Sequence, residues 1–408
     1  MVHQAQHWIW QQKGWPNVTF DAVRVLRPAG DARRAQGLVA GAMSAITDRD
    51  RRQLLAQALT DEAVTTSQIE GETLDPASVR RSIERRLRLD PNAKPDRRRR
   101  EARATEGMAA VTVDAVEHAA NPLTTSRLLR WHRMLSPSGL AADQVGSFRT
   151  SEIHVEPGPI GRETIHFVAP PPGRVEHEVD GFLLWLATAE SGDRLITAAL
   201  SHLIFVTIHP FADGNGRISR AIADLLLARD VGNEISVSMT RQILAERQDY
   251  YTVLERTQRN GLDVTDWLLW FLGCYERAAL HTLDVVREVE GANRIFARAA
   301  QRGLNERQAG VLRVFLDRYE GRLNPAKYAQ IAAVSKDTAQ RDLADLVEKR
   351  VLERSGATSN VSYVVAPDIA EPAIPLRPAR PQMAADTVPP TSPRRRNEGH
   401  SAVAWRCV

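Results

Sequence analysis

Twelve consecutive residues hold the side chains in this sequence that are best suited to chemistry: His209-Pro210-Phe211-Ala212-Asp213-Gly214-Asn215-Gly216-Arg217-Ile218-Ser219-Arg220. A histidine can take up a proton near neutral pH, a carboxylate binds hard cations, and an arginine binds phosphate through two parallel hydrogen bonds. The combination favours a site for a phosphate-containing substrate over a helix-loop-helix in which the glycines merely cap and turn the chain.

The polar stretch lies between two predicted helices. Residues 195–208 are apolar with helical spacing, and a helical pattern resumes after Arg217. The second helix therefore starts at the two glycines, where free backbone N–H groups and the positive end of the helix dipole can hold phosphate. Arg217 and Arg220 are three residues apart, so they share one face of that helix near its start. Asp213 lies beside this anion site, as a ligand of nucleotide-bound Mg²⁺ would.

The stretch resembles the signature of Fic-domain proteins, HPF-x-[DE]-GNGR-x-x-R, with every fixed position filled. The resemblance implies nucleotidyl transfer, most often of AMP from ATP to a target hydroxyl. It implies that His209 is the catalytic base and that Asp213 is the Mg²⁺ ligand. The ATP-binding residues that it implies within the stretch are Phe211, Gly214, Asn215, Gly216, Arg217 and Arg220.

A second short motif lies far upstream, at the end of a predicted helix. Thr66-Ser67-Gln68-Ile69-Glu70-Gly71 resembles the inhibitory motif [ST]-x-x-x-E-[GN] of the same family. By that resemblance Thr66, Glu70 and Gly71 are inhibitory residues, and Glu70 forms an ion pair with Arg220. An arginine neutralised by a carboxylate cannot hold the γ-phosphate, so ATP could not bind productively. The alternative is a surface glutamate near a helix end.

Residues 151–172 change from helical to β-like spacing, which predicts a hairpin ahead of the signature. They follow Gly146-Ser147-Phe148-Arg149, which is similar to the G-x-[FY]-R element of Fic proteins. In that family a hairpin in this place docks the target segment beside the catalytic histidine; the alternative is a purely structural hairpin. The docking residues implied by the resemblance are Ile153, His154, Val155, His166, Phe167 and Val168.

The helix after the signature resembles the one that lines the adenine pocket in Fic proteins. Tyr250 or Tyr251 could stack on a base, and Gln258 stands where many relatives have asparagine. The alternative for each tyrosine is packing in the core.

Composition and charge fit a globular protein of two or three domains. The chain has 408 residues, 43% of them hydrophobic, and its net charge of +4 is too small to argue nucleic-acid binding by itself. The two cysteines, Cys274 and Cys407, favour a reducing, cytoplasmic location over a disulfide framework. No apolar run reaches the length of a membrane span, so no membrane partner is expected. The sequence leaves the oligomeric state open, a homodimer included.

The expected fold is mainly α: a Fic helical core with a β-hairpin flap, followed by a C-terminal winged helix-turn-helix domain. The expected segments are an aromatic cap at 1–30, N-terminal helices with the inhibitory helix at 31–110, the Fic core at 111–290, the winged-helix domain at 291–366 and a disordered tail at 367–408. Within the N-terminal segment, the apolar spacing predicts one helix over 37–58 and another over 61–70.

The last helix of the predicted winged domain presents Lys336, Gln340 and Arg341 outward, which suits DNA binding. The alternative is a degenerate winged helix that makes protein contacts. Two functions follow. In the first, the protein transfers AMP from ATP to a Ser, Thr or Tyr hydroxyl of an unknown target protein and is autoinhibited by Glu70. In the second, it is a DNA-binding regulator that senses nucleotide without transferring it. Removal of AMP, or another nucleotide donor, is a third option within the enzyme class.

Overall fold

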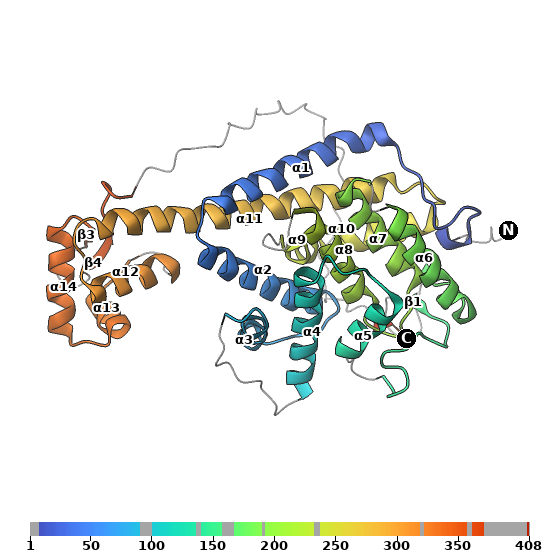
Figure 1. Ribbon diagram of the computed structural model, residues 1–408, viewed down its shortest axis with the longest axis horizontal. Coiled ribbons are helices and arrows are strands. Elements are labelled where there is room, and N and C mark those ends of the chain that lie inside the picture. The colour runs from blue at the N-terminus through green and yellow to red at the C-terminus, as the bar shows by residue number, and fades with distance from the viewer. Residues whose placement is uncertain are drawn as a thin grey trace, which may run out of the picture. The chain divides into compact units, whose positions relative to one another are not determined.

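The computed structural model describes residues 8–89, 100–135, 140–156, 167–189, 192–231, 237–318, 322–356, 361–370 and 406–407 (Figure 1). Helices make up most of this part of the chain, as the sequence predicts. The α-helices are α1 Ala22–Ser44, α2 Asp48–Ile69, α3 Pro76–Arg86, α4 Arg100–Glu117, α5 Thr125–Leu135, α6 Val175–Ala189, α7 Arg194–Ile208, α8 Asn215–Val231, α9 Met239–Ala245, α10 Arg247–Arg259, α11 Thr265–Ala300, α12 Glu306–Arg318, α13 Pro325–Ala332 and α14 Lys336–Glu348. The strands are β1 His154–Glu156, β2 Phe167–Val168, β3 Leu352–Ser355, β4 Ser362–Val365 and β5 Arg406–Cys407.

Helices α7 and α8 form the centre of the first compact unit, which comprises Met1–Val286 and Ala402–Val408. The Asp193 carboxylate caps α7 by accepting hydrogen bonds from the backbone N–H groups of Leu195 and Ile196. Nearly every residue of α7 is buried, in keeping with its mainly apolar sequence. The polar loop between the two helices is thereby attached to a buried helix.

The prediction of one helix over 37–58 is wrong. The chain leaves α1 after Ser44 and starts α2 at Asp48, because the Thr47 hydroxyl accepts a hydrogen bond from the backbone N–H of Asp50 and caps the new helix. Helix α2 then runs without a break to Ile69, through the boundary that the sequence suggested near residue 60. The predicted inhibitory motif therefore lies at the end of a 22-residue helix.

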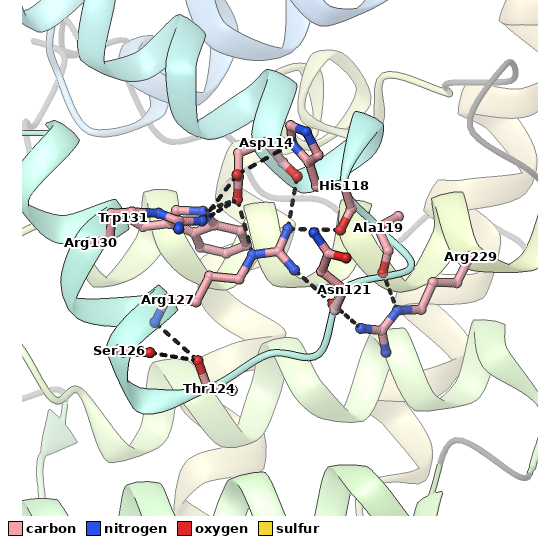
Figure 2. Close-up of polar contacts among 10 residues, drawn as sticks. All are labelled: Asp114, His118, Ala119, Asn121, Thr124, Ser126, Arg127, Arg130, Trp131 and Arg229. Carbon is pink, nitrogen blue, oxygen red and sulfur yellow. Dashed lines mark hydrogen bonds and ion pairs between the residues drawn. The ribbon is translucent and has the colours of Figure 1, made fainter.

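A polar cluster ties α4, α5 and α8 together (Figure 2). The Arg127 guanidinium donates to the Asp114 carboxylate and to the carbonyls of Asp114, His118 and Asn121, which lie at or beyond the end of α4. Arg229, near the end of α8, donates to the carbonyls of Ala119 and Asn121. Burial opposes ionisation of Asp114, but the hydrogen bond from Trp131 and the charges of Arg127 and Arg130 outweigh it and lower the pKa of that carboxyl. The cluster satisfies carbonyls that the end of a helix leaves unpaired, so its role is structural.

The predicted hairpin is present in the described strands. β1 pairs antiparallel with β2, with Val155 opposite Phe167, and the other edge of β1 pairs with β5 near the end of the chain. The aromatic segment at the start of the chain covers the hairpin: Trp8 packs edge-on against Phe167, and the Trp10 indole N–H donates to the Val168 carbonyl at 2.7 Å. The loop residues 157–166 lie outside the described residues.

The second unit, Arg287–Ser401, has its own core, which includes Leu312, Tyr328, Leu343 and Leu346. In chain order it contains α12, α13, α14 and the antiparallel hairpin β3–β4, with Leu352 opposite Val365. Arg307 and Tyr328 both donate to the buried Asp342 carboxylate and hold α12, α13 and α14 together. The assignment of this unit as a winged helix stays a prediction, and residues 371–405 of the predicted tail lie outside the described residues.

Among the described residues, no helix is both long enough and apolar enough to cross a membrane. Cys274 is a buried free thiol on α11.

Candidate active site

His209 ends α7 in the left-handed conformation, with φ of 52°, and only 7% of its surface is exposed. Its Nδ1 lies 3.2 Å from the Val206 carbonyl oxygen and donates to it, which places the lone pair of the imidazole on Nε2. Burial lowers the pKa of His209 to about 4, and the nearby charge of Arg149 acts in the same direction. The imidazole is therefore neutral near pH 7 and has the form that a general base requires.

Arg149 holds the turn at His209 in place. Its guanidinium is buried and donates to the backbone carbonyls of His209 at 2.7 Å, Ser151 at 2.9 Å and Pro170. Its own backbone N–H donates to the Pro210 carbonyl at 3.0 Å. The Arg149 side chain thus connects two parts of the chain: the turn that contains His209, and the segment that follows the hairpin.

His132 supports the other side of the same loop. Its ring lies parallel to that of Phe211, with the two centroids 4.2 Å apart. Its Nδ1 accepts from the backbone N–H of Gly146 and its Nε2 donates to the Asp213 carbonyl at 3.1 Å. Phe211, predicted to bind ATP, is fully buried in this stack, so it anchors the loop from within the core.

Asn215 closes the loop on itself. Its side-chain oxygen accepts from the backbone N–H of Phe211 at 2.9 Å, and its amide nitrogen donates to the Phe211 carbonyl at 2.8 Å. Gly214 precedes it with φ of +86°, a conformation that favours glycine. In this structure Asn215 shapes the start of α8, and its predicted contact with phosphate would require those bonds to rearrange.

Arg217 and Arg220 lie on the first turns of α8, and both are almost completely buried. Among the described residues, neither Arg217 Nε nor Arg220 Nη1 has a hydrogen-bond partner. Two buried donors without acceptors, close to a helix N-terminus, fit an anion such as a polyphosphate. The arrangement agrees with the phosphate-binding role that the sequence predicts for these arginines.

The ion pair predicted between Glu70 and Arg220 is present. Glu70 Oε1 lies 2.6 Å from Arg220 Nη2, and Thr66 adds two acceptors, its hydroxyl at 2.7 Å from Arg220 Nε and its carbonyl at 3.2 Å from Nη2. Burial opposes ionisation of Glu70, but the charge and hydrogen bond of Arg220 outweigh it and lower the pKa of that carboxyl. A Cβ atom on Gly216 would lie 2.2 Å from Glu70 Oε1, so the carboxylate rests against the glycine at the start of α8.

Asp213 is the predicted metal ligand. Its Oδ2 is 3.0 Å from Arg217 Nη2, its Oδ1 accepts from the backbone N–H of Gly214, and its side chain is 35% exposed. The described residues contain no cluster of three or more side chains that could hold a metal by themselves. A single accessible carboxylate beside an anion site does fit Mg²⁺ that arrives bound to a nucleotide, because Mg²⁺ takes one or two carboxylates and fills its other positions with phosphate oxygens and water.

The three residues predicted to hold the nucleotide base lie on α10. Tyr250 is fully buried and its hydroxyl lies 3.0 Å from His202 Nε2, and burial raises the pKa of Tyr250 to about 12. Tyr251 lies next to it, under the Arg247 guanidinium. Gln258 donates to the Thr207 hydroxyl inside the core. Of the three, the partly buried Tyr251 is the best placed to meet a ligand.

The predicted docking residues divide into three groups. The side chains of Ile153 and Phe167 are each 4% exposed and pack with Trp8 and Trp10, so they hold the hairpin to the body of the unit. His154, Val155 and Val168 lie in the paired strands. His166 lies outside the described residues.

The sequence profile of the Fic/DOC family matches residues 122–227, which include the loop, both arginines, His132 and Arg149. Residues 122–227 form a Fic domain. A domain of unknown function, DUF4172, matches residues 8–89, which include α1, α2 and α3. Glu70, which pairs with Arg220, and Glu72, which pairs with Arg217, therefore lie outside the Fic domain, in the region that DUF4172 matches.

Curated relatives and solved structures agree with this assignment. The chain is 29% identical over 136 residues to a protein adenylyltransferase Fic of Nematostella vectensis, covering 33% of this chain and 28% of the relative. It is 28% identical over 273 residues to that of Drosophila ananassae, covering 65% of this chain and 49% of the relative. The chain thus spans less than half the length of either relative. The crystal structure of a Fic family protein from Desulfovibrio desulfuricans G20 superimposes with a TM-score of 0.55, at 21% identity, over 86% of this chain and 99% of that one.

Three residues of the Fic site carry contacts that the sequence did not reveal. His132 does not belong to any sequence motif that would identify it as a functional residue. Arg149 belongs to an element similar to one of the family, but only the structure shows it against the turn at His209. Glu72 lies two residues beyond Glu70, and its Oε2 is 2.6 Å from Arg217 Nη1. In the sequence, only the position of Glu72 close to Glu70 could have pointed to it. In the structure, both carboxylates face the start of α8.

Proposed function

We propose that this protein transfers AMP from ATP to a Ser, Thr or Tyr hydroxyl of a target protein, and that Glu70 holds the resting protein at low activity. The observation that carries the proposal is the neutral His209 imidazole, with its lone pair on Nε2, on the loop that leads into α8, whose first turns hold two buried arginines with unsatisfied donors. A base beside a polyphosphate site is what transfer of a phosphoryl-linked group to a hydroxyl requires.

In the proposed reaction the target hydroxyl oxygen attacks the α-phosphorus of ATP. His209 Nε2 takes the hydroxyl proton, a bond forms between the target oxygen and phosphorus, and the bond from phosphorus to the bridging oxygen of the β-phosphate breaks. Pyrophosphate leaves with that electron pair. Arg217, Arg220 and the N-terminus of α8 orient the phosphates, and Arg149 keeps His209 in line. Mg²⁺ held by Asp213 would neutralise charge on the phosphates.

Autoinhibition by Glu70 follows from the contacts of Arg220. Glu70 and Thr66 satisfy Arg220 Nε and Nη2, so a γ-phosphate can take the hydrogen bond of Nη2 only after the carboxylate leaves. A carboxylate beside a phosphate also repels it. The resting protein would therefore bind ATP weakly or in an unproductive pose.

The test is intact-mass spectrometry of the Glu70→Gly protein after incubation with ATP and Mg²⁺, beside the wild type and the Glu70→Gly/His209→Ala double variant. We expect the mass of one or more AMP groups on the Glu70→Gly protein, far less on the wild type and none on the double variant. An added mass other than that of AMP would show that a different group is transferred from ATP, and would refute AMP transfer. No added mass on any of the three, with or without candidate target proteins, would refute the transfer.

A further inference from the structure

The end of α2 is built so that two carboxylates face the same way. The backbone N–H of Gly71 donates to the Gln68 carbonyl at 3.0 Å, and that of Glu72 donates to the Ser67 carbonyl at 2.9 Å. With Gly71 at φ of +80°, these bonds form a Schellman motif, in which a left-handed glycine reverses the chain after the last turn. Glu70 and Glu72 thus flank one glycine at a sharply defined helix end.

The two arginines opposite them are spaced to match. Arg217 and Arg220 lie three residues apart on α8, so their guanidinium groups share one face. Glu72 Oε2 meets Arg217 Nη1 at 2.6 Å, and Glu70 Oε1 meets Arg220 Nη2 at the same distance. The Schellman motif on α2 therefore pairs one carboxylate with each arginine of the phosphate site.

We propose that Glu72 is a second inhibitory carboxylate, which blocks Arg217 as Glu70 blocks Arg220. The inference rests on the proposed function, since it takes ATP as the substrate of this site. Arg217 is 4% exposed, and both of its outer nitrogens have acidic partners, Glu72 on Nη1 and Asp213 on Nη2. A phosphate that approaches Arg217 must displace Glu72, because Asp213 belongs to the loop itself.

Removal of Glu70 alone then opens only half of the site. Arg220 becomes available, while Arg217 stays neutralised by Glu72. The Glu72 side chain is 30% exposed and therefore already partly hydrated. It can rotate into solvent once phosphate competes for Arg217. Full opening of the phosphate site requires both carboxylates to leave.

A third contact lets the charges be tested without moving the helix. The Arg247 guanidinium donates to the Ile69 carbonyl at 2.7 Å and holds the end of α2 independently of both acids. Replacing either glutamate by glutamine keeps the side-chain shape and removes its charge. Such variants probe the electrostatic block with the end of α2 still attached to α10.

The experiment is a double-mutant cycle on ATP affinity, measured by titration calorimetry with Mg²⁺. All four proteins carry His209→Ala, so that no transfer occurs, and they differ by Glu70→Gln, Glu72→Gln, both or neither. We expect Glu72→Gln to raise the affinity about fivefold on its own, and by at least as much on the Glu70→Gln background. Glu176→Gln, at an exposed position of α6, is the matched control and should leave the affinity unchanged.

The proposal is overturned if Glu70→Gln raises the affinity and Glu72→Gln does not raise it on either background. Thermal melts identify a variant that has lost its fold, and Glu72→Ala then replaces Glu72→Gln in the cycle. The cycle needs no turnover, so its failure differs from failure of the transfer, which is read from the mass of the Glu70→Gly protein. In proteins that keep His209, Glu70→Gly/Glu72→Gln should also modify itself about fivefold faster than Glu70→Gly.

Discussion

The two sides of the catalytic loop hold their arginines in different ways. On the His209 side, Arg149 donates to the backbone carbonyls of Ser151, Pro170 and His209, which cannot move away unless the chain itself moves. On the phosphate side, Arg217 and Arg220 are paired with the side chains of Glu72 and Glu70. Those carboxylates come from the region matched by DUF4172, outside the Fic domain.

The difference separates a permanent part of the site from a reversible one. Backbone acceptors keep the proposed base in position whether or not substrate is present, which is preorganisation. Carboxylate acceptors on a neighbouring helix can be exchanged for phosphate oxygens, because both are anions that take the same donors. Under the proposed function, the base is held in position throughout, and control acts at the arginines that would bind ATP.

The largest effect is expected at the proposed base. His209→Ala on the Glu70→Gly background should lower the rate of AMP transfer about 1,000-fold, since a general base contributes roughly 10²–10⁴-fold. Nucleotide affinity should change little, because the arginine side is untouched. The measurement is incorporation of label from α-labelled ATP, with His177→Ala, at an exposed position of α6, as the control. An undiminished rate would assign the base to another group.

Arg149→Ala tests the permanent side. Loss of the guanidinium leaves buried carbonyls without donors, so the free energy of unfolding should fall by about 3 kcal/mol. The transfer rate of the Glu70→Gly protein should fall about 100-fold, because the turn at His209 can shift. Urea unfolding and label incorporation measure the two effects. Arg256→Ala, at a half-exposed arginine, should change neither, and an equal loss there would show that the effect is unspecific.

Asp224→Asn tests how α2 is held on α8. Glu62 of α2 is buried and accepts from Ser238 and Thr240, and the Asp224 carboxyl of α8 lies close enough to Glu62 for the two groups to interact electrostatically. Burial, together with the charge of Glu62, raises the pKa of Asp224 well above its ordinary range, so the pair keeps a proton.

A raised folded-state pKa gives stability that is complete below about pH 4 and is lost as the pH rises through the raised value. Asparagine keeps a donor toward Glu62 and cannot ionise. The variant should therefore lose less stability than the wild type as the pH rises above about 4, as measured by urea unfolding at each pH. Parallel pH profiles would contradict the shared proton.

The smallest effect is expected from Thr66→Val, which tests the reversible contacts between α2 and Arg220. Valine keeps the shape but removes the hydroxyl that accepts from Arg220 Nε at 2.7 Å. With one acceptor fewer, α2 should release Arg220 more readily, and self-modification of otherwise wild-type protein should rise about fivefold. Thr252→Val, at an exposed position of α10, serves as the control. A decrease in self-modification would indicate that Thr66 supports the active state instead.

Much of the site could be predicted because its residues are contiguous. The signature from His209 to Arg220 fixes a loop and a helix start within twelve residues, so its local geometry follows from helix capping and glycine conformation. The pair between Glu70 and Arg220 was also predictable, but only through resemblance, since 150 residues separate its partners. The mainly helical fold was predicted from apolar spacing together with the family resemblance.

Other features depend on contacts that spacing does not encode. His132 and Arg149 act through backbone carbonyls of the loop, and any residue type offers the same acceptors, so the sequence shows no complementary partner. The break at Ala45–Thr47 was missed because apolar positions continue across it while a single threonine hydroxyl starts the next helix. Burial of Ile153 and Phe167 under the aromatic segment depends on the distant Trp8 and Trp10.

The unpaired donors on Arg217 and Arg220 have an energetic consequence. Each buried polar atom without a partner costs about 1–3 kcal/mol, and two such atoms lie in the resting site. The closed arrangement is therefore less stable than its short ion pairs alone would indicate. A polyphosphate that supplies the missing acceptors relieves this penalty, and each 1.4 kcal/mol relieved favours the open form tenfold. Under the proposed function, ATP would bring to Arg217 and Arg220 acceptors that the two carboxylates do not supply.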